Sequence, residues 1–275
     1  MHMKRTMLRR MLLGLSLAVF AFAVTGCGSP QMKSSVKDDS LQKILDAGQL
    51  VLGLDTEFPP MGFIDEQGEI TGFDIDVAQE VCNRLGVKLV KKGINWNTKE
   101  EDLNNGAIDC IWNGMSVTPA RAEAMNLSEP YMKNEVIVVV PGGSKAEGLR
   151  DLSGRKVGVQ SGSTAQEVLE TSDRIKDITV ISFDDNLELL QKLEKGEIDA
   201  ALIDSVVAYY FIFSRAEQFY ILPDSLGEEE YAIGFRKGDQ ELRDRVQEIL
   251  IGMKTDGKLG EISKKWFGSD ITIVR

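Results

Sequence analysis

Histidine is almost absent from this 275-residue chain, and cysteine is scarce. The single histidine is His2, and the three cysteines are Cys27, Cys82 and Cys110. A zinc site needs clustered histidine or cysteine ligands and a hydrolytic triad needs a histidine base, so neither is available. Cys82 and Cys110 lie inside apolar patterns, which favours two buried thiols, although a disulfide in an oxidising compartment stays open. We therefore expect no bound metal and no cofactor.

Basic residues are also fewer than acidic ones. The chain has 32 Lys and Arg residues against 43 Asp and Glu residues, a net charge of −11. Proteins that bind nucleic acid present a basic patch, so nucleic acid is not an expected partner. An acidic surface is typical of a well-hydrated protein outside the cell.

Long apolar runs are absent except near the N-terminus. Lys4, Arg5, Arg9 and Arg10 precede an apolar run at 11–24 that is too short to span a bilayer comfortably. We interpret residues 1–26 as a signal peptide, whose loss removes four positive charges from the net of −11 and leaves −15. No second run is long enough to span, so the mature chain is expected to be anchored to a membrane rather than threaded through it.

The end of this leader indicates how the anchor is made. Val24-Thr25-Gly26-Cys27 resembles the lipobox of bacterial lipoproteins, which implies cleavage before Cys27 and lipidation of its thiol. An ordinary signal peptide with a chance cysteine is the alternative. Residues 27–40 are polar and are interpreted as a tether between the lipid and the folded chain.

The remaining chain, about 235 residues, is long enough for two lobes of ordinary size. Hydrophobic patterns and Gly stops predict an alternation of strands and helices, which indicates parallel βαβ units and an α/β fold. We expect strands at residues 50–54, 87–90, 108–112, 135–140, 156–160, 178–183, 199–203 and 231–235, and helices at residues 41–47, 77–85, 100–105, 164–169, 185–193, 241–254 and 259–266.

Two parts of this series repeat one another. Leu103-x-x-Gly-x-Ile-Asp109 recurs as Leu193-x-x-Gly-x-Ile-Asp199, each combining a helix end, a Gly stop and a buried strand. Open α/β sheets bind ligands at the carboxyl ends of their strands. Two such lobes are therefore expected to face each other across a ligand-binding cleft.

One strand–loop–helix segment is suited to an anion. A buried strand is expected to end in a polar loop at 113–116, after which Thr118 caps a helix with Pro119 at its first position. The helix N-terminus attracts an anion, and Arg121 in the first turn could grip a carboxylate with two hydrogen bonds. The plainer interpretation is a simple connection with a surface arginine.

Five motifs together resemble a known family, the amino-acid-binding group of bacterial extracellular solute-binding proteins (family 3). The motifs are Gly53-x-Asp-x-x-x-x-Pro60, Gly72-Phe-Asp-Ile-Asp76, Met115-Ser-Val-Thr-x-x-Arg121, Gly158-Val-x-x-Gly-Ser-Thr164 and the segment 199–204. The resemblance implies a two-lobed periplasmic-binding-protein fold (type II) with two hinge strands and the ligand between the lobes. We place the first lobe at 41–132 and 232–270, and the second lobe at 136–227.

The resemblance also implies roles for matching residues. Arg121 would clamp the ligand α-carboxylate, helped by Ser116, Ser163 and Thr164. Asp204 would pair with the α-ammonium group, helped by the Gly114 carbonyl and the Ser116 hydroxyl. Taken singly, Asp204 could merely cap a helix and Ser163 could be only an N-cap.

The same comparison places a pocket for the ligand side chain. Its members would be Asp55, Phe58, Trp96, Asn113 and Gln160, next to Met115. An acid beside an aromatic face favours a basic side chain, because both attract a cation. Asn113 and Gln160 offer neutral hydrogen bonds, so glutamine is a close second, and cystine stays open. Trp96 could also be ordinary core.

Together these features imply a lipid-anchored substrate-binding protein of an amino-acid ABC importer, on the extracytoplasmic face of the cell membrane. It would capture a polar L-amino acid by lobe closure and deliver it to the transmembrane permease. It is expected to be monomeric and not an enzyme. Two alternatives stay open: a secreted enzyme similar to prephenate or arogenate dehydratases, with Asp55 or Glu57 as the acid, and an amino-acid-sensing receptor protein.

The lipobox interpretation is testable at its cysteine. Replacing Cys27 by Ser removes the thiol that would carry the lipid, so the variant should leave the membrane fraction or accumulate as uncleaved precursor. Fractionation and mass spectrometry of the N-terminus measure both. An unlipidated wild-type protein with a different N-terminus would contradict the interpretation.

Overall fold

The structure is a computed structural model, and it describes residues 37–214 and 218–275. The predicted signal peptide, the lipidation site at Cys27 and most of the tether lie outside the described residues. Residues Asp38–Arg275 form one compact unit. Among the helices described, none combines the length and apolar character needed to cross a membrane.

A mixed sheet forms the centre of this unit, with strand order β10-β9-β11-β8-β12-β6-β1-β5 and β7 paired to β12. Its strands are β1 (Gln49–Leu54), β5 (Lys88–Gly93), β6 (Cys110–Ser116), β7 (Asn126–Leu127), β8 (Met132–Pro141), β9 (Lys156–Gln160), β10 (Thr179–Phe183), β11 (Ala200–Asp204) and β12 (Phe219–Phe235). The β1–β5–β6 group and the β9–β10–β11 group are parallel within themselves. The long antiparallel strands β8 and β12 lie between the two groups.

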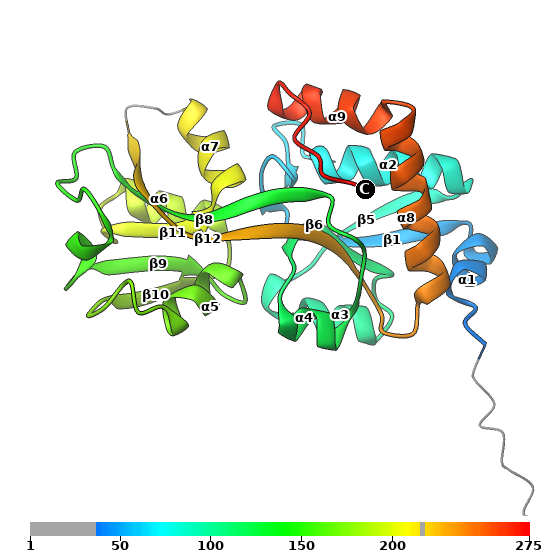
Figure 1. Cartoon of the computed structure of the whole chain (residues 1–275), viewed down its shortest axis with the longest axis horizontal. Coiled ribbons are helices and arrows are strands. Elements are labelled where there is room, and N and C mark those ends of the chain that lie inside the picture. Colours follow the sequence, from blue (N-terminus) through cyan, green and yellow to red (C-terminus); the bar gives the residue numbers. More distant parts are fainter. Residues whose placement is uncertain (1–36, 215–217) are drawn as a thin grey trace, which may run out of the picture. The chain divides into compact units, whose positions relative to one another are not determined.

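The unit has two lobes, each made of one group of parallel strands and the helices that cover it (Figure 1). Lobe 1 surrounds the β1–β5–β6 group with α1 (Ser40–Ala47), α2 (Phe73–Leu85), α3 (Lys99–Asn104), α4 (Pro119–Ala124), α8 (Gln240–Thr255) and α9 (Lys258–Phe267). It also holds a small sheet of β2 (Glu57–Phe58), β3 (Gly62–Ile64) and β4 (Ile70–Thr71). Lobe 2 surrounds the β9–β10–β11 group with α5 (Thr164–Thr171), α6 (Asn186–Glu194) and α7 (Ser205–Ser214).

The two-lobed α/β fold expected from the sequence is therefore confirmed. The two strands predicted to link the lobes pair side by side, from Met132 with Tyr231 to Glu135 with Glu228. The exact lobe boundaries stay a prediction. Cys82 and Cys110 are buried free thiols, as the apolar patterns favoured.

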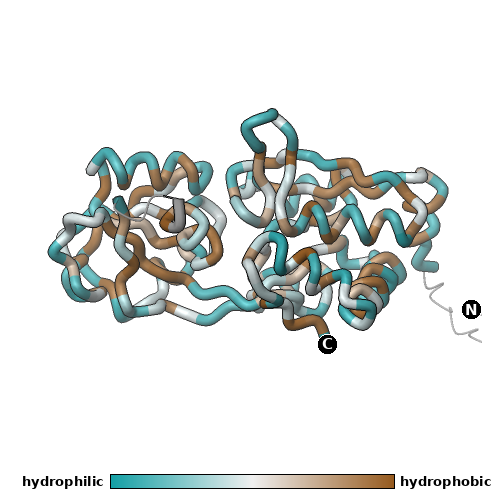
Figure 2. The backbone as a smooth tube through the Cα atoms, turned by 90° about the horizontal axis from the view of Figure 1, so that it is seen from above, coloured by the Kyte–Doolittle hydropathy of each residue, from teal (hydrophilic) through white to brown (hydrophobic). Residues whose placement is uncertain are grey.

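Buried aliphatic side chains hold each lobe together. Leu50, Leu52 and Leu54 of β1 have no exposed surface, because alternate residues of a strand share one face and this face packs in the main hydrophobic core. In Figure 2 hydrophobic residues recur along the strands and alternate with hydrophilic ones along the helices. This is the pattern of central strands covered by amphipathic helices.

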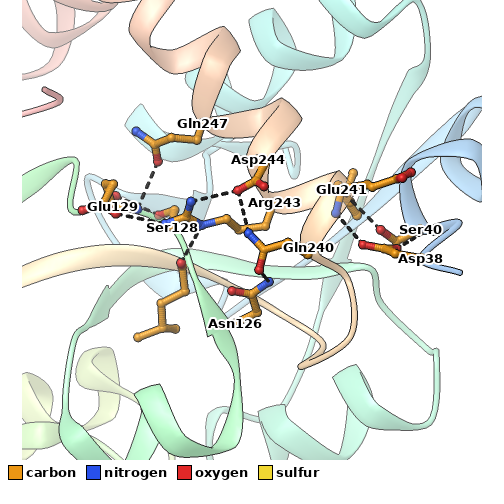
Figure 3. A network of polar contacts seen from close by, with 12 residues as sticks. Asp38, Ser40, Asn126, Ser128, Glu129, Gln240, Glu241, Arg243, Asp244 and Gln247 are labelled. Atoms are coloured by element: carbon orange, nitrogen blue, oxygen red, sulfur yellow. Dashed lines mark hydrogen bonds and ion pairs between the residues drawn. The ribbon is translucent and has the colours of Figure 1, made fainter. Parts of the chain in front are cut away.

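Polar contacts tie the C-terminal part of lobe 1 to its first part (Figure 3). Arg243 Nε on α8 donates to the carbonyl of Leu127 at 2.8 Å, and Gln247 Oε1 accepts from the Glu129 N–H at 3.0 Å. Near the start of the same helix, Ser40 Oγ accepts from the Leu242 N–H at 3.1 Å. The chain thus returns to lobe 1 after crossing to lobe 2.

One local prediction was wrong: residues 113–116 are not a loop. They continue β6 through a bulge, in which residues 112–114 lie opposite the single residue Ile233 of β12. Gly114 adopts φ +55°, which lets the strand bend without ending. The Gly114 N–H, turned away from β12, donates to Asp74 Oδ2 at 2.8 Å.

The geometry of the bulge requires glycine at position 114. In Gly114→Ala the new Cβ would stand 2.7 Å from Phe58 Cε1 at a left-handed backbone angle. We expect the free energy of unfolding to fall by about 2 kcal/mol, measured by urea denaturation. Gly143→Ala is the control, because nothing lies within 4 Å of its added Cβ. Equal stability of the two variants would contradict this account of the bulge.

Candidate functional site

One cavity gathers residues from both lobes. The space inside it, counting the solvent at its mouth, is about 270 Å³. It is lined by Phe58, Trp96, Asn113, Gly114, Ser116, Arg121, Gln160, Ser163, Thr164 and Asp204. All of these were predicted from the sequence as ligand-binding residues. Two other predicted residues, Asp55 and Met115, do not line this cavity.

Arg121 forms the cationic end of the cavity. Thr118 Oγ1 caps α4 by accepting from the Arg121 N–H at 3.2 Å, as predicted, with Pro119 at the first helical position. Arg121 is 6% exposed, and its guanidinium donates to the Ser116 carbonyl at 2.8 Å and to the Gly162 carbonyl at 3.2 Å. Burial lowers the pKa of Arg121, but nearby acids oppose this and an arginine remains charged.

A second helix begins beside the arginine. Ser163 Oγ accepts from the Gln166 N–H at 3.2 Å and so caps α5, which starts at Thr164. Thr164 Oγ1 donates to Ser116 Oγ at 3.5 Å, a long contact between the lobes. The free N–H groups of a helix N-terminus and the guanidinium together suit a carboxylate.

Asp204, at the end of β11, forms the anionic end. It is 9% exposed and accepts from the Tyr231 hydroxyl at 3.0 Å and from Asn134 Nδ2. Burial raises the pKa of Asp204 to about 8, and the charge of Glu229 adds to this. The two hydrogen bonds and the charge of Arg121 oppose the shift. A cation placed beside this carboxyl would favour its ionised form.

Three polar residues beside Asp204 were missed from the sequence: Asn134, Glu229 and Tyr231. All lie on the linking strands β8 and β12, outside the motifs that carried the resemblance. A signal was present for Asn134, because it is polar at an inward position of an alternating strand, between exposed Lys133 and Glu135. No comparable pattern marks Glu229, which stands within a run of three glutamates.

Asp55 lies behind the cavity wall. Its Oδ2 accepts from Gln160 Nε2 at 2.6 Å, and its Oδ1 accepts from the Glu57 N–H at 2.8 Å. Gln160 Oε1 in turn accepts from Asn186 Nδ2 at 2.8 Å. Burial raises the pKa of Asp55, the Glu57 and Gln160 hydrogen bonds lower it, and the charge of Asp185 raises it further. In this structure, therefore, the Asp55 carboxylate contacts the cavity lining through Gln160, and the Asp55 N–H donates to Oδ1 of the cavity residue Asn113 at 3.1 Å.

The other residue outside the cavity, Met115, belongs to the core of lobe 1. It is fully buried in a cluster that includes Ile111 and Met125. Met115 points away from the cavity that the adjacent Gly114 and Ser116 line, because adjacent side chains of a strand point to opposite faces. A ligand-binding role for Asp55 or for Met115 stays a prediction.

The aromatic wall carries a buried lysine. Lys99 Nζ lies 5.0 Å from the centre of the Trp96 ring and donates to the Trp96 carbonyl at 3.1 Å. It also donates across the lobes to the Gly162 carbonyl at 3.3 Å. Burial, and then the charge of Arg121, lower the pKa of Lys99. Lys99 thus holds Trp96 in place and joins the contacts that close the two lobes around the cavity.

Comparison with known proteins identifies the family. Residues 50–269 match bacterial extracellular solute-binding proteins, family 3. The chain belongs to this family.

Individual relatives agree along nearly the whole chain. The L-cystine-binding protein TcyJ of Escherichia coli (strain K12) is 29% identical, with 94% of this chain and 98% of TcyJ covered. The arginine-binding extracellular protein ArtP of Bacillus subtilis (strain 168) is 31% identical, with 94% and 98% covered.

A solved structure is similar too. It is a substrate-binding protein of an ABC uptake transporter from Streptococcus pneumoniae with bound histidine, which is 34% identical. Its TM-score is 0.82, with 85% of this chain and 98% of that chain covered. These relatives are amino-acid-binding proteins, not enzymes, and they belong to a family of extracellular proteins.

The two charged ends of the cavity are testable by truncation. Arg121→Ala and Asp204→Ala each leave one charge of a bound amino acid desolvated and unpaired, so each should weaken binding by about 2–5 kcal/mol. Calorimetry measures the loss. Arg245→Ala and Asp173→Ala are matched controls on exposed ion pairs and should bind as the wild type does. Wild-type affinity in either cavity variant would mean that the site lies elsewhere.

Proposed function

We propose that this protein captures a free polar L-amino acid and delivers it to the transmembrane permease of an ABC importer. The observation that carries the proposal is that Arg121 and Asp204, a cation and an acid from different lobes, line the same small cavity. A free α-amino acid carries the complementary charges, on a carboxylate group and an ammonium group attached to the same carbon atom. The amino-acid-binding relatives support the same conclusion.

Binding and closure would be coupled. Arg121 belongs to lobe 1 and Asp204 to lobe 2, so a ligand held by both ties the lobes together. A ligand shifts such an equilibrium only through its preference for the closed form. The permease can then distinguish the loaded protein from the empty one by its closed shape.

For the ligand side chain we favour a basic group. Asp55, the acid behind Gln160, is buried, and burial and the charge of Asp185 raise its pKa. Acids that oppose each other's ionisation attract a cation. Phe58 and Trp96 add aromatic surface suited to a flat guanidinium or imidazole. Gln160 and Asn113 offer neutral hydrogen bonds instead, which keeps glutamine second.

Anchoring belongs to the same proposal. A lipid on Cys27 would hold the protein at the extracytoplasmic face of the cell membrane, close to the permease, and the protein would act as a monomer. The dehydratase alternative predicts turnover of prephenate or arogenate, and we expect none. The receptor alternative predicts that deleting the protein changes a signalling response and leaves uptake intact.

A panel of ligands tests the proposal. Thermal denaturation is measured with each of the twenty amino acids and with L-cystine, followed by calorimetry of those that raise the melting temperature. We expect arginine, lysine, histidine or glutamine to stabilise the protein. No stabilisation by any compound would overturn the proposed function. Stabilisation only by an acidic or aliphatic amino acid would overturn the assignment of the side-chain pocket.

Asp55→Asn separates the two leading ligand classes. If the ligand is cationic, loss of the partner charge should weaken binding by about 2–5 kcal/mol. If the ligand is glutamine, the amide can still accept from Gln160 and the loss should be far smaller. Calorimetry gives the difference. The control is Glu66→Gln, which neutralises an exposed acid in the same lobe. A basic ligand whose affinity is insensitive to Asp55→Asn would contradict the role of this acid.

A further inference from the structure

The linking strand β12 places an acid beside the ammonium end of the cavity. Glu228, Glu229 and Glu230 are consecutive on β12, and only the middle one bonds the residues around Asp204. Glu229 Oε2 accepts from Ser116 Oγ at 2.7 Å and from Asn134 Nδ2 at 3.0 Å. Glu229 therefore contacts a cavity residue of lobe 1 and the other linking strand at once.

Asn134 joins this acid to Asp204. Its Nδ2 donates to Asp204 Oδ1 and to Glu229 Oε2, so the two carboxyl groups share one amide nitrogen. The orientation of the amide is set by Ser205, whose hydroxyl donates to Asn134 Oδ1 at 3.0 Å. The NH₂ group must therefore face the two acids.

Two carboxyl groups held this close do not both ionise readily. Asp204 is buried, and the charge of Glu229 follows burial as the second cause that raises the pKa of Asp204 to about 8. The other titratable neighbours of Asp204 are Tyr231, which donates to it, and Arg121, whose charge favours ionisation. Burial and the neighbouring acid therefore both favour the protonated form of Asp204 at neutral pH.

We propose that Glu229 is a second acid of the ammonium subsite, and that Asp204, whose ionisation the charge of Glu229 opposes, releases a proton to solvent when an α-ammonium group binds. This inference rests on the proposed function. The proton passes to buffer and the ammonium charge replaces it, so the net charge of the subsite is restored without any covalent change.

Ser116 links the pair to the cavity. Its hydroxyl proton points to Glu229, so the oxygen presents lone pairs to the cavity that it lines. Those lone pairs can accept from an ammonium group. Glu229 thus both adds negative charge and holds Ser116 as an acceptor, which selects an α-amino over an α-hydroxy group.

Proton release is measured on the wild-type protein. Calorimetric titrations at pH 7 in two buffers of different ionisation enthalpy use L-arginine, or whichever amino acid of the panel binds most tightly. We expect release of about one proton per ligand, with affinity that rises as pH increases from 6 to 8. The α-hydroxy analogue of the same compound lacks the α-ammonium cation and should bind at least tenfold more weakly, without proton release.

Glu229→Gln tests the second acid. The amide keeps the shape and can still accept from Ser116, but it removes the charge that opposes ionisation of Asp204. We expect fewer protons released at pH 7, a flatter dependence of affinity on pH, and about tenfold weaker binding at pH 8.5, where Asp204 of the wild type is mostly ionised. The matched control is Glu228→Gln on the adjacent exposed residue, which should match the wild type throughout.

The outcomes separate the two proposals. If no amino acid binds the wild type, the proposed function fails. If an amino acid binds without proton release, or if Glu229→Gln and Glu228→Gln give the same proton count and affinity, the function stands and the role of Glu229 is overturned. Circular dichroism and melting temperature establish that each variant is folded, and the wild-type buffer series requires no variant at all.

Discussion

The hydrogen bond between the Gly114 N–H and Asp74 is the contact on which the site depends. Asp74 is fully buried and accepts from Gly114 at 2.8 Å and from the Tyr131 hydroxyl at 3.0 Å. Burial raises the pKa of Asp74 to about 7, and both hydrogen bonds oppose the shift. Burying an acid is costly unless hydrogen-bond donors contact it. Asp74 therefore depends on the Gly114 N–H, which the bulge in β6 directs toward it. The bulge in turn presents Asn113 and Gly114 to the cavity.

This contact gives a physical meaning to the Gly72-Phe-Asp-Ile-Asp76 motif. Its first acid points inward to the bulge, whereas its second acid, Asp76, accepts from the Trp266 indole N–H at 2.7 Å and pairs with Lys265 on α9. One short helical segment therefore secures the binding strand on one side and the C-terminal helix on the other. The motif positions the site without touching the cavity.

The two linking strands do more than join the lobes. Asn134 and Tyr231 satisfy Asp204, and Glu229 raises its pKa, so the charge state of the anionic end depends on β8 and β12. Contacts across the lobes gather around the same cavity, including Gln160 with Asp55 and Arg121 with the Gly162 carbonyl. The contacts between the lobes and the electrostatics of the cavity consequently depend on the same few buried polar groups.

The sequence by itself determined the α/β class, the two lobes and the residues that line the cavity. It did so because strand periodicity, helix caps and glycine stops are local signals, and because five motifs fall in one order. Only the tertiary structure showed that 113–116 is a bulged strand, since that depends on Asp74, some forty residues earlier in the chain. Only the tertiary structure placed Asp55 behind Gln160 and Glu229 beside Asp204. Those placements follow from strand register and burial, which join residues that lie far apart in sequence and carry no local pattern of their own.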